Sequence, residues 1–273
     1  MKQLFEILPS EWAEKFSKTM KERIELSFTN EDVISLIESK VGGRGYLPKE
    51  QGYPVNEGGE PLFFLAQINF AEMPQIENYP KSGILAFYVD YHDDLYGLNF
   101  DDQTEQNGFR VFFFENIDRE SMTAEEQAVY FEGIDKSALY TVVKGEYKLA
   151  GRVTKELLMN DILEFEKELG SGFYDIMEQI FGDDEDKANE LFDLATYSSQ
   201  IGGFPFFTQE DPRMRTENSY HDTLLFQLDS EYSEEPGAQI NIMWGMSGVG
   251  NFFINKQDLI NRDFSNVIFN WDC

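Results

Sequence analysis

One pattern occurs twice in this chain and constrains its fold more than any other feature. A pair of glycines is followed, 25 residues after its first member, by a glutamine inside an apolar run. The two copies are Gly42-Gly43 with Gln67, and Gly202-Gly203 with Gln227. A second glycine-led apolar run then follows, over 83–88 in one copy and 248–254 in the other. The repetition predicts two related β units, and a ligand cleft is most often found between such units.

The order of the expected elements predicts an α+β protein with mostly antiparallel sheets. The repeat-like units span about 42–116 and 201–273, and a helical connector over 117–200 joins them. We expect a single compact domain over 1–273, with N-terminal helices packed on the first unit. The last apolar run, 267–271, is expected to be a strand that fixes the C-terminus in a sheet.

Helical spacing of apolar residues marks the N-terminal segment. A first stripe predicts one helix with Ser10 as its N-cap, and a second stripe predicts a short helix that begins near residue 29 or 30. The first stripe consists of Trp12, Phe16, Met20 and Ile24, and the second of Val33, Leu36 and Ile37.

The connector carries both helical stripes and a local excess of acid. Thr123 and Glu126 have the spacing of a capping box, a strand pair is expected over 139–153, and three apolar stripes follow between 158 and 195. Residues 153–200 include 3 basic and 13 acidic residues. The acidic run Asp183, Asp184, Glu185 and Asp186 is either a solvated helix face or a docking surface for a partner.

Polar residues interrupt the two apolar strands that contain the glutamines. Strand alternation places Phe64, Ala66 and Ile68 on one face and Leu65, Gln67 and Asn69 on the other. The second copy places Gln227 and Asp229 together in the same way. These four polar residues either line a cleft between the units or form a buried hydrogen-bond network that fixes how the units dock, because an unsatisfied buried amide costs about 1–3 kcal/mol. Trp244 and Arg213 join the cleft candidates by sequence pattern alone.

No recognised catalytic or metal-binding motif is present. Both histidines occur as Tyr-His-Asp, at 91–93 and 220–222, but they occupy different places in the two copies, so turn chemistry explains them better than a general-base pair. The chain lacks the histidine and cysteine spacings of zinc sites, the serine elbow of hydrolases and the phosphate-binding loop. We therefore expect no catalytic residue, no metal and no cofactor.

The net charge is −29, from 51 acidic and 22 basic residues. Such a surface disfavours nucleic acid and anionic membranes as partners and favours a basic protein. The single cysteine, Cys273, excludes an intramolecular disulfide, which fits a reducing compartment. Residues 1–6 do not read as a signal peptide, and no apolar run approaches the roughly 20 residues of a membrane span. We expect a soluble, cytoplasmic protein.

Several segments together resemble the YwqG-like family of bacterial proteins, and the resemblance covers nearly the whole chain. The segments are Gly42-Gly43, Leu47-Pro48, Pro54, 61–68, 83–87, 211–213, 224–230, Trp244-Gly245 and 252–254. The sequence departs from the family at Gly45, where proline is usual. The resemblance implies an α+β fold with an internal duplication and supplies no catalytic residues. Some members look like immunity components encoded beside secreted toxins.

Three hypotheses of function follow. The leading one is a non-enzymatic binding protein, such as an immunity protein that neutralises a basic toxin domain. The alternative is an enzyme or small-ligand binder that uses the cleft between the two units. A scaffold with no small-molecule site is the third.

Overall fold

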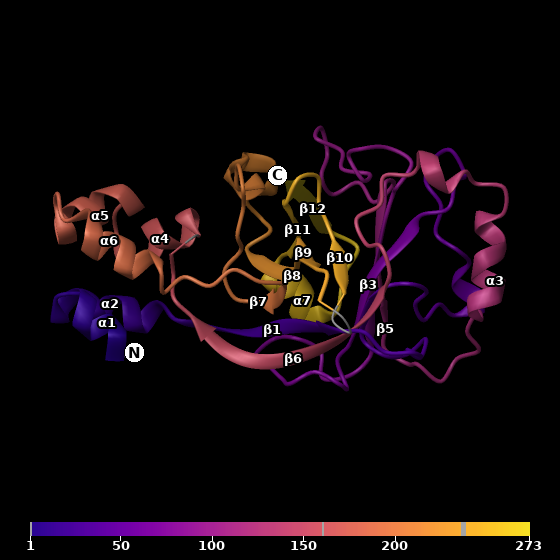
Figure 1. Ribbon diagram of the computed structural model, residues 1–273, viewed down its shortest axis with the longest axis horizontal. Helices are drawn as coiled ribbons and strands as arrows, with labels where there is room; N and C mark the ends of the chain where they lie inside the picture. Colours follow the sequence, from indigo (N-terminus) through magenta and orange to yellow (C-terminus); the bar gives the residue numbers. More distant parts are fainter. Residues whose placement is uncertain (1, 160, 236–238) are drawn as a thin grey trace.

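The computed structural model describes all residues except 1, 160 and 236–238 (Figure 1). Its main feature is a ten-stranded sheet in which the strands pair in the antiparallel sense, in the order β12-β11-β8-β7-β1-β6-β2-β3-β4-β5. The sheet strands are β1 (Lys21–Thr29), β2 (Lys40–Gly42), β3 (Phe63–Asn69), β4 (Ile84–Val89), β5 (Phe109–Phe114), β6 (Glu146–Glu156), β7 (Gln200–Gly202), β8 (Thr223–Asp229), β11 (Val249–Ile254) and β12 (Val267–Asp272). A separate hairpin pairs β9 (Glu231–Ser233) with β10 (Ile240–Ile242).

Helices and short 3-10 turns complete the fold. The α-helices are α1 (Lys2–Ile7), α2 (Ser10–Thr19), α3 (Ala124–Ala128), α4 (Ile162–Leu169), α5 (Phe173–Phe181), α6 (Glu185–Phe192) and α7 (Lys256–Asn261). The 3-10 turns are Lys49–Gln51, Val129–Phe131, Lys136–Ala138, Pro212–Met214 and Thr216–Asn218. The expectation of an α+β protein with mostly antiparallel strands is confirmed. Among the described residues, no helix combines the length and apolar character needed to cross a bilayer.

The long strands β1 and β6 form the centre of the sheet. They pair over nine residues, from Lys21 opposite Glu156 to Thr29 opposite Lys148. Beside β6 lies a first wing of β2, β3, β4 and β5, and beside β1 lies a second wing of β7, β8, β11 and β12. Both central strands lie outside the predicted units 42–116 and 201–273. Strand β1 precedes the first wing in sequence but pairs with β7 of the second wing. Strand β6 precedes the second wing but pairs with β2 of the first wing.

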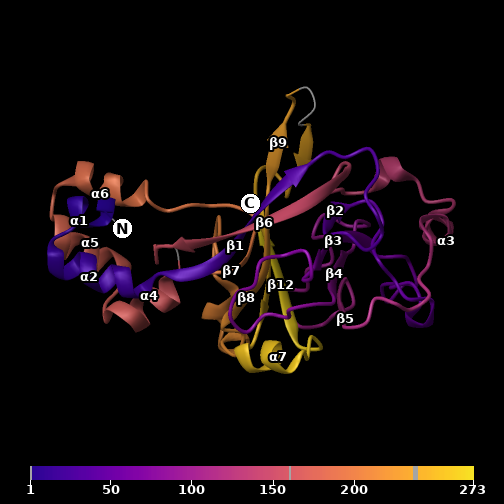
Figure 2. The same ribbon diagram turned by 90° about the horizontal axis from the view of Figure 1, so that it is seen from below.

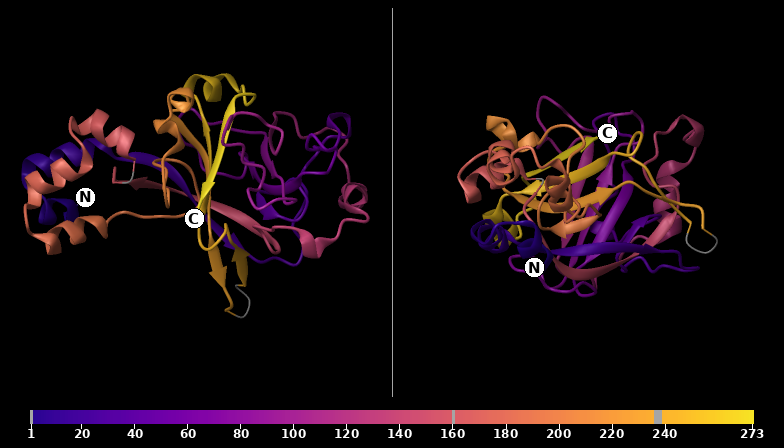
Figure 3. Two further views of the ribbon diagram at one scale, coloured as in Figure 1. Left: turned by 90° about the horizontal axis from the view of Figure 1, so that it is seen from above. Right: turned by 60° about the vertical axis from the view of Figure 1, so that its left-hand side comes forward.

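The main core lies between the two wings. The ring of Phe87 on β4 stacks on Phe226 of β8 at 4.8 Å, and the ring of Phe109 on β5 lies 5.5 Å from that of Phe269 on β12. The sheet therefore curls until its wings face one another, and its shape is nearly that of a barrel (Figure 3).

A bulge changes the side-chain alternation at the start of β3. Pairing with β4 shifts register between Phe64 and Ala66, so Leu65 turns into the main core while Phe64 joins an outer cluster. The expectation that Phe64 shares a face with Ala66 is therefore wrong. Strand β8 skips Leu225 against β11 in the same way. A bulge adds one unpaired residue, which reverses the faces on one side of it.

The N-terminal helices belong to a separate helical cluster and not to the first wing, which corrects the expectation from the sequence. Buried side chains of α1 and α2 pack with those of α4, α5 and α6, and the ring of Phe16 meets that of Phe165 edge-on at 5.8 Å. Figures 1 and 2 show this cluster projecting from one end of the sheet. Its buried residues include Leu4, Leu8, Ala13, Phe16, Phe165, Ile176 and Leu191.

The apolar spacing predicts helical structure beyond the point where the N-terminal helices end. Helix α2 ends at Thr19, and Ile24 lies in β1, where buried residues alternate with period two. No helix forms over 30–39, where Val33 is 82% exposed, so its apolar spacing marks no buried face. Ser10 is the first residue of α2, and the N-cap position is Pro9.

The connector gives a mixed result. Residues 139–153 contribute to one strand, β6, rather than to a pair. The capping box at Thr123 and Glu126 is confirmed, as is the C-terminal strand. The capping box depends only on neighbouring residues, which is why the sequence predicts it correctly.

Candidate functional site

Gln67 and Asn69 are buried and bond to the loops of their own wing. The amide oxygen of Gln67 accepts from the backbone N–H of Tyr46 at 2.8 Å, and its amide nitrogen donates to the carbonyls of Leu36 and Glu38. Asn69 donates to the carbonyl of Ile37 at 2.9 Å. These side chains hold the chain on both sides of β2 against β3.

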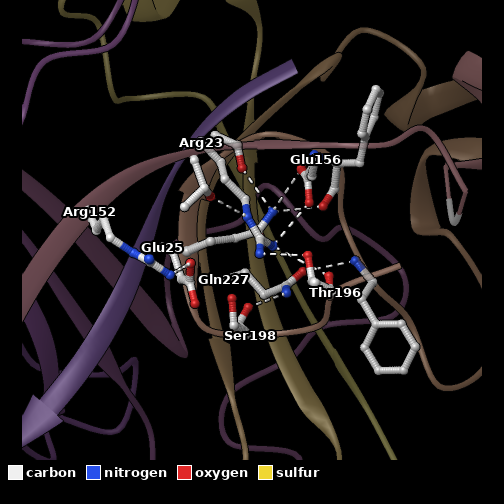
Figure 4. A network of polar contacts seen from close by, with 12 residues as sticks. Arg23, Glu25, Arg152, Glu156, Thr196, Ser198 and Gln227 are labelled. Atoms are coloured by element: carbon white, nitrogen blue, oxygen red, sulfur yellow. Dashed lines mark hydrogen bonds and ion pairs between the residues drawn. The ribbon is translucent and has the colours of Figure 1, made fainter. Parts of the chain in front are cut away.

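Gln227 and Asp229 occupy the same places in the second wing. Gln227 accepts from the N–H of Phe206 at 2.8 Å and donates to the carbonyl of Ser198 (Figure 4). Asp229 is half-buried, its backbone N–H donates to Ser199 Oγ, and burial raises the pKa of its carboxyl. Gln67 and Asn69 therefore bond to loops of the first wing, and Gln227 and Asp229 bond to loops of the second wing.

Trp244 lies beside the end of β8, where its backbone N–H donates to Ser230 Oγ at 2.9 Å, and Arg213 lies in the 3-10 turn Pro212–Met214. The fully buried Trp244 stacks on Trp271 with ring centroids 6.1 Å apart and meets the ring of Tyr96 edge-on. Arg213 is buried in ion pairs with Asp211 at 2.6 Å and Asp161 at 3.0 Å. Asp161 is also the N-cap of α4, so Arg213 ties the helical cluster to the second wing.

The acidic run at the start of α6 is exposed throughout. Asp184 caps the helix by accepting from the N–H of Lys187, and its carboxylate also pairs with the Lys187 ammonium at 3.3 Å. These contacts lower the pKa of Asp184. Asp183, Glu185 and Asp186 lie around this cap on the outer side of the helical cluster.

A different set of residues lines a small cavity, which we call the Arg44 pocket. Its volume is about 220 Å³. It lies where the end of β2 and the start of β3 meet the segment 131–143. The lining residues are Gly42, Gly43, Arg44, Phe63, Phe64, Tyr91, Phe131, Ile134, Lys136, Leu139, Thr141 and Val143.

The glycine pair creates one wall of this pocket by turning the chain sharply after β2. Gly42 and Gly43 both have positive φ, at 74° and 69°. A Cβ on Gly42 would clash with the carbonyl oxygen of Gly145, and one on Gly43 would clash with the carboxyl group of Glu146. Only glycine allows both this turn and this close approach of the two segments.

Aromatic rings form the floor of the Arg44 pocket. Phe63 stacks on Tyr91 with ring centroids 4.8 Å apart and lies 4.9 Å from Phe131. The neighbouring segment is held in place because the N–H of Tyr140 donates to the carbonyl of Tyr91 at 2.9 Å. The floor is therefore an apolar surface with fixed geometry.

Both charged residues of the lining are basic. The Arg44 guanidinium lies 4.4 Å from the ring centroid of Phe131 and donates to the carbonyl of Gly43. Lys136 is exposed at the rim. The adjacent Glu146 carboxylate is paired with the buried Lys40 ammonium at 2.7 Å. Among the described ion pairs, none involves Arg44 or Lys136, so both cations can meet an anionic ligand.

A second cavity, of about 560 Å³, occupies the corresponding place in the other half. Gly202, Gly203, Thr223 and Leu224 line it as Gly42, Gly43, Phe63 and Phe64 line the first. Its four lysines are accompanied by five carboxylates, so it shows no preference for one sign of charge. Of these two cavities, the Arg44 pocket is the one whose charged lining residues all have the same sign.

A buried polar network surrounds Arg23 and Glu156 (Figure 4). Arg23 donates to Glu156 at 3.0 Å, to Gln200 and to Thr196, and the backbone N–H of Phe204 donates to Glu156. Burial raises the pKa of Glu156 to about 7, and the charge of Arg23 opposes that rise. The network joins β1, β6 and β7.

Sequence reasoning identified the glycine pair but not the pocket beside it. In the sequence Arg44 is only a neighbour of the glycines, and the pocket also needs residues from 131–143, which no pattern in the sequence connects to them. The described residues contain no group of three or more His, Cys, Asp or Glu side chains placed to hold a metal ion.

Comparison with known proteins gives one clear result. A search among curated proteins found no match. The sequence model of a family described as a domain of unknown function, DUF1963, matches residues 39–273, which include the sheet apart from β1. The chain therefore belongs to the DUF1963 family.

Proposed function

We propose that this protein binds a small molecule in the Arg44 pocket, and that the ligand carries an anionic group on an apolar, flat body. The observation that carries the proposal is the lining charge: two cations and no carboxylate line this pocket, in a chain with a net charge of −29. An anionic group beside Arg44 and Lys136 would gain charge-assisted hydrogen bonds. The alternative hypothesis from the sequence placed a small-ligand site in a cleft between the two units, and we place it in the Arg44 pocket instead.

The apolar part of the ligand follows from the floor. Phe63 and Phe131 offer aromatic surface, and rings stack on such surfaces with a gain of about 0.5–1.5 kcal/mol. The cavity of about 220 Å³ is below the roughly 300–1,000 Å³ of drug-sized sites, so the ligand is a small metabolite.

Phenylacetate is a suitable first probe, with phenylacetamide as its neutral equivalent of the same shape. We expect phenylacetate, titrated by calorimetry at low salt, to bind more tightly than phenylacetamide. Arg44→Gln should remove this difference. Arg119→Gln is the matched control, because Arg119 is exposed and pairs with Glu50 outside the pocket. Equal affinity of both probes for the wild-type protein would contradict the proposal.

Docking of a basic protein, such as a toxin domain, is the second candidate function. The exposed carboxylates of 183–186 on the projecting helical cluster support it (Figure 2). Charge complementarity would speed association and make it salt-sensitive. Neutralising Asp183 and Asp186 should slow association with a basic partner at low salt, whereas unchanged kinetics would count against this candidate. A cytoplasmic location, and the absence of nucleic-acid and membrane partners, stay predictions.

We also propose that the two wings are copies of one ancestral unit and that the YwqG-like resemblance is correct. Gln67 and Gln227 lie 160 positions apart, as do Ser39 and Ser199, and each pair makes the same hydrogen bonds; the two glycine pairs have the same spacing. An alignment of relatives in which 40–69 and 200–229 match one another better than chance would support the duplication. The acidic helices α4, α5 and α6 would then be an insertion before the second copy.

A further inference from the structure

A hollow lined by aromatic side chains lies between the helical cluster and the second wing. Its volume is about 440 Å³. We call it the aromatic hollow, and its rings are those of Phe173, Tyr174, Phe192, Tyr197, Phe206 and Phe207. Tyr174 is 83% exposed, and Phe192 and Tyr197 are also exposed. These three rings are therefore accessible to a ligand or to a side chain of another protein.

The charges of the aromatic hollow are opposite to those of the Arg44 pocket. Glu166, Asp175 and Asp211 line it, and its lining contains no lysine or arginine. Asp211 is already paired with Arg213, whereas Glu166 and Asp175 are exposed at the edge. Ring faces and carboxylates are the two groups that attract an organic cation, so the lining selects for positive charge.

The same protein already holds a cation in this manner beside the hollow. The guanidinium carbon of Arg213 lies 4.9 Å from the ring centroid of Phe253 and 6.0 Å from that of Phe207, with its nitrogens on Asp161 and Asp211. Phe207 belongs to both arrangements. The buried Arg213 thus shows how a second guanidinium would be held on the outer side of these rings.

We propose that the aromatic hollow receives an arginine or lysine side chain of a basic partner protein. The proposal deepens the second candidate function and rests on it. The acidic helices supply the long-range attraction, and the hollow supplies the short-range contacts that fix where the partner docks.

The test uses the full chain and a fluorescein-labelled nona-arginine peptide, followed by anisotropy at about 150 mM salt, where exposed charges further apart than about 8 Å are screened. Tyr174→Ala removes a ring without changing the charge, and Asp175→Asn removes one charge at the hollow. Each should weaken binding about threefold or more, as expected for loss of one cation–π or charged contact.

Two matched variants make the result specific. Tyr232→Ala removes an exposed tyrosine on β9, and Glu115→Gln removes one exposed charge directly after β5, in the first wing. Both should leave the affinity close to that of the wild type. Circular dichroism and thermal unfolding establish that each variant is folded.

Two results would overturn the proposal, and they separate it from the candidate on which it rests. If Tyr174→Ala binds as the wild type while Asp183→Asn weakens binding, the partner docks on the acidic run and the hollow is not the anchor. If the wild type does not bind the peptide even at low salt, docking of a basic partner fails as well.

Discussion

Gln67 and Gln227 are 160 positions apart and make equivalent hydrogen bonds in the two wings. Each amide oxygen accepts from a backbone N–H 21 residues earlier, that of Tyr46 or Phe206, at 2.8 Å. Each amide nitrogen donates to a carbonyl 29 residues earlier, that of Glu38 or Ser198. One buried side chain therefore fixes the chain on both sides of a glycine pair.

The first prediction concerns these two glutamines. Gln67→Leu and Gln227→Leu should each lower the free energy of unfolding by about 2–4 kcal/mol, because each leaves a buried N–H and at least one buried carbonyl without a partner. Urea unfolding measures the change. Gln179→Leu on the exposed face of α5 is the control and should have little effect. If either buried variant is as stable as the wild type, that glutamine is not a structural residue.

The second prediction concerns the pH dependence of stability. Burial raises the pKa of Glu156 from 4.5 to about 7, so the folded state binds more protons than the unfolded state between these values. The contribution of this group to stability is therefore fully present below pH 4.5 and is lost as the pH rises through about 7. The loss is about 3 kcal/mol at most.

Urea unfolding at about pH 5 and about pH 8 tests this effect. Glu156→Gln cannot titrate, so the difference in stability between the two pH values should change by up to that amount relative to the wild type. Glu235→Gln, at an exposed glutamate, serves as the control and should keep the wild-type dependence. A Glu156→Gln profile parallel to that of the wild type would show that Glu156 does not titrate in this range.

Local sequence patterns predicted the strands of both wings well. The glycine-led apolar runs at 83–88 and 248–254 became β4 and β11, and the capping box at Thr123 became the start of α3. These patterns depend on near neighbours in the chain, and burial on one face is enough to produce them.

The features that the sequence did not reveal depend on contacts between distant segments. Nothing near β1 indicates that it will lie between β6 and β7, and the placement of α1 and α2 depends on a match with α4, α5 and α6 that only folding creates. The Arg44 pocket is of this kind, because the segments 42–44 and 131–143 that line it are far apart in the sequence. The bulges at Leu65 and Leu225 were missed because alternation was assumed to continue.

The third prediction concerns Arg213, a sequence candidate for ligand binding. Arg213→Leu should lower the free energy of unfolding by about 3–5 kcal/mol, because it leaves the buried carboxylates of Asp161 and Asp211 without their counter-ion. Thermal unfolding measures the loss. Arg215→Leu, at a neighbouring exposed arginine, should cost much less. A stable Arg213→Leu protein would return Arg213 to the list of ligand-binding candidates.

The fourth prediction concerns the glycine at position 45. A Cβ on Gly45 would clash with the ring of Phe64. The residues 160 positions after Gly45 and Phe64 are Pro205 and Leu224, so the smaller side chain at 224 accompanies the larger residue at 205. Gly45→Ala should therefore destabilise the protein by about 1–3 kcal/mol through overpacking.

Replacing the ring should relieve this clash. Phe64→Leu alone should also destabilise the protein, because it shortens a buried side chain. In the double variant, however, Gly45→Ala should cost about 1 kcal/mol less than it does alone, since removal of the Phe64 ring leaves room for the added methyl group. A double-mutant cycle by urea unfolding gives this coupling directly. Additive effects would mean that the Phe64 ring is not what requires glycine at position 45, and Gln67 Oε1, the other side-chain atom that a Cβ there would meet, would then be the remaining cause.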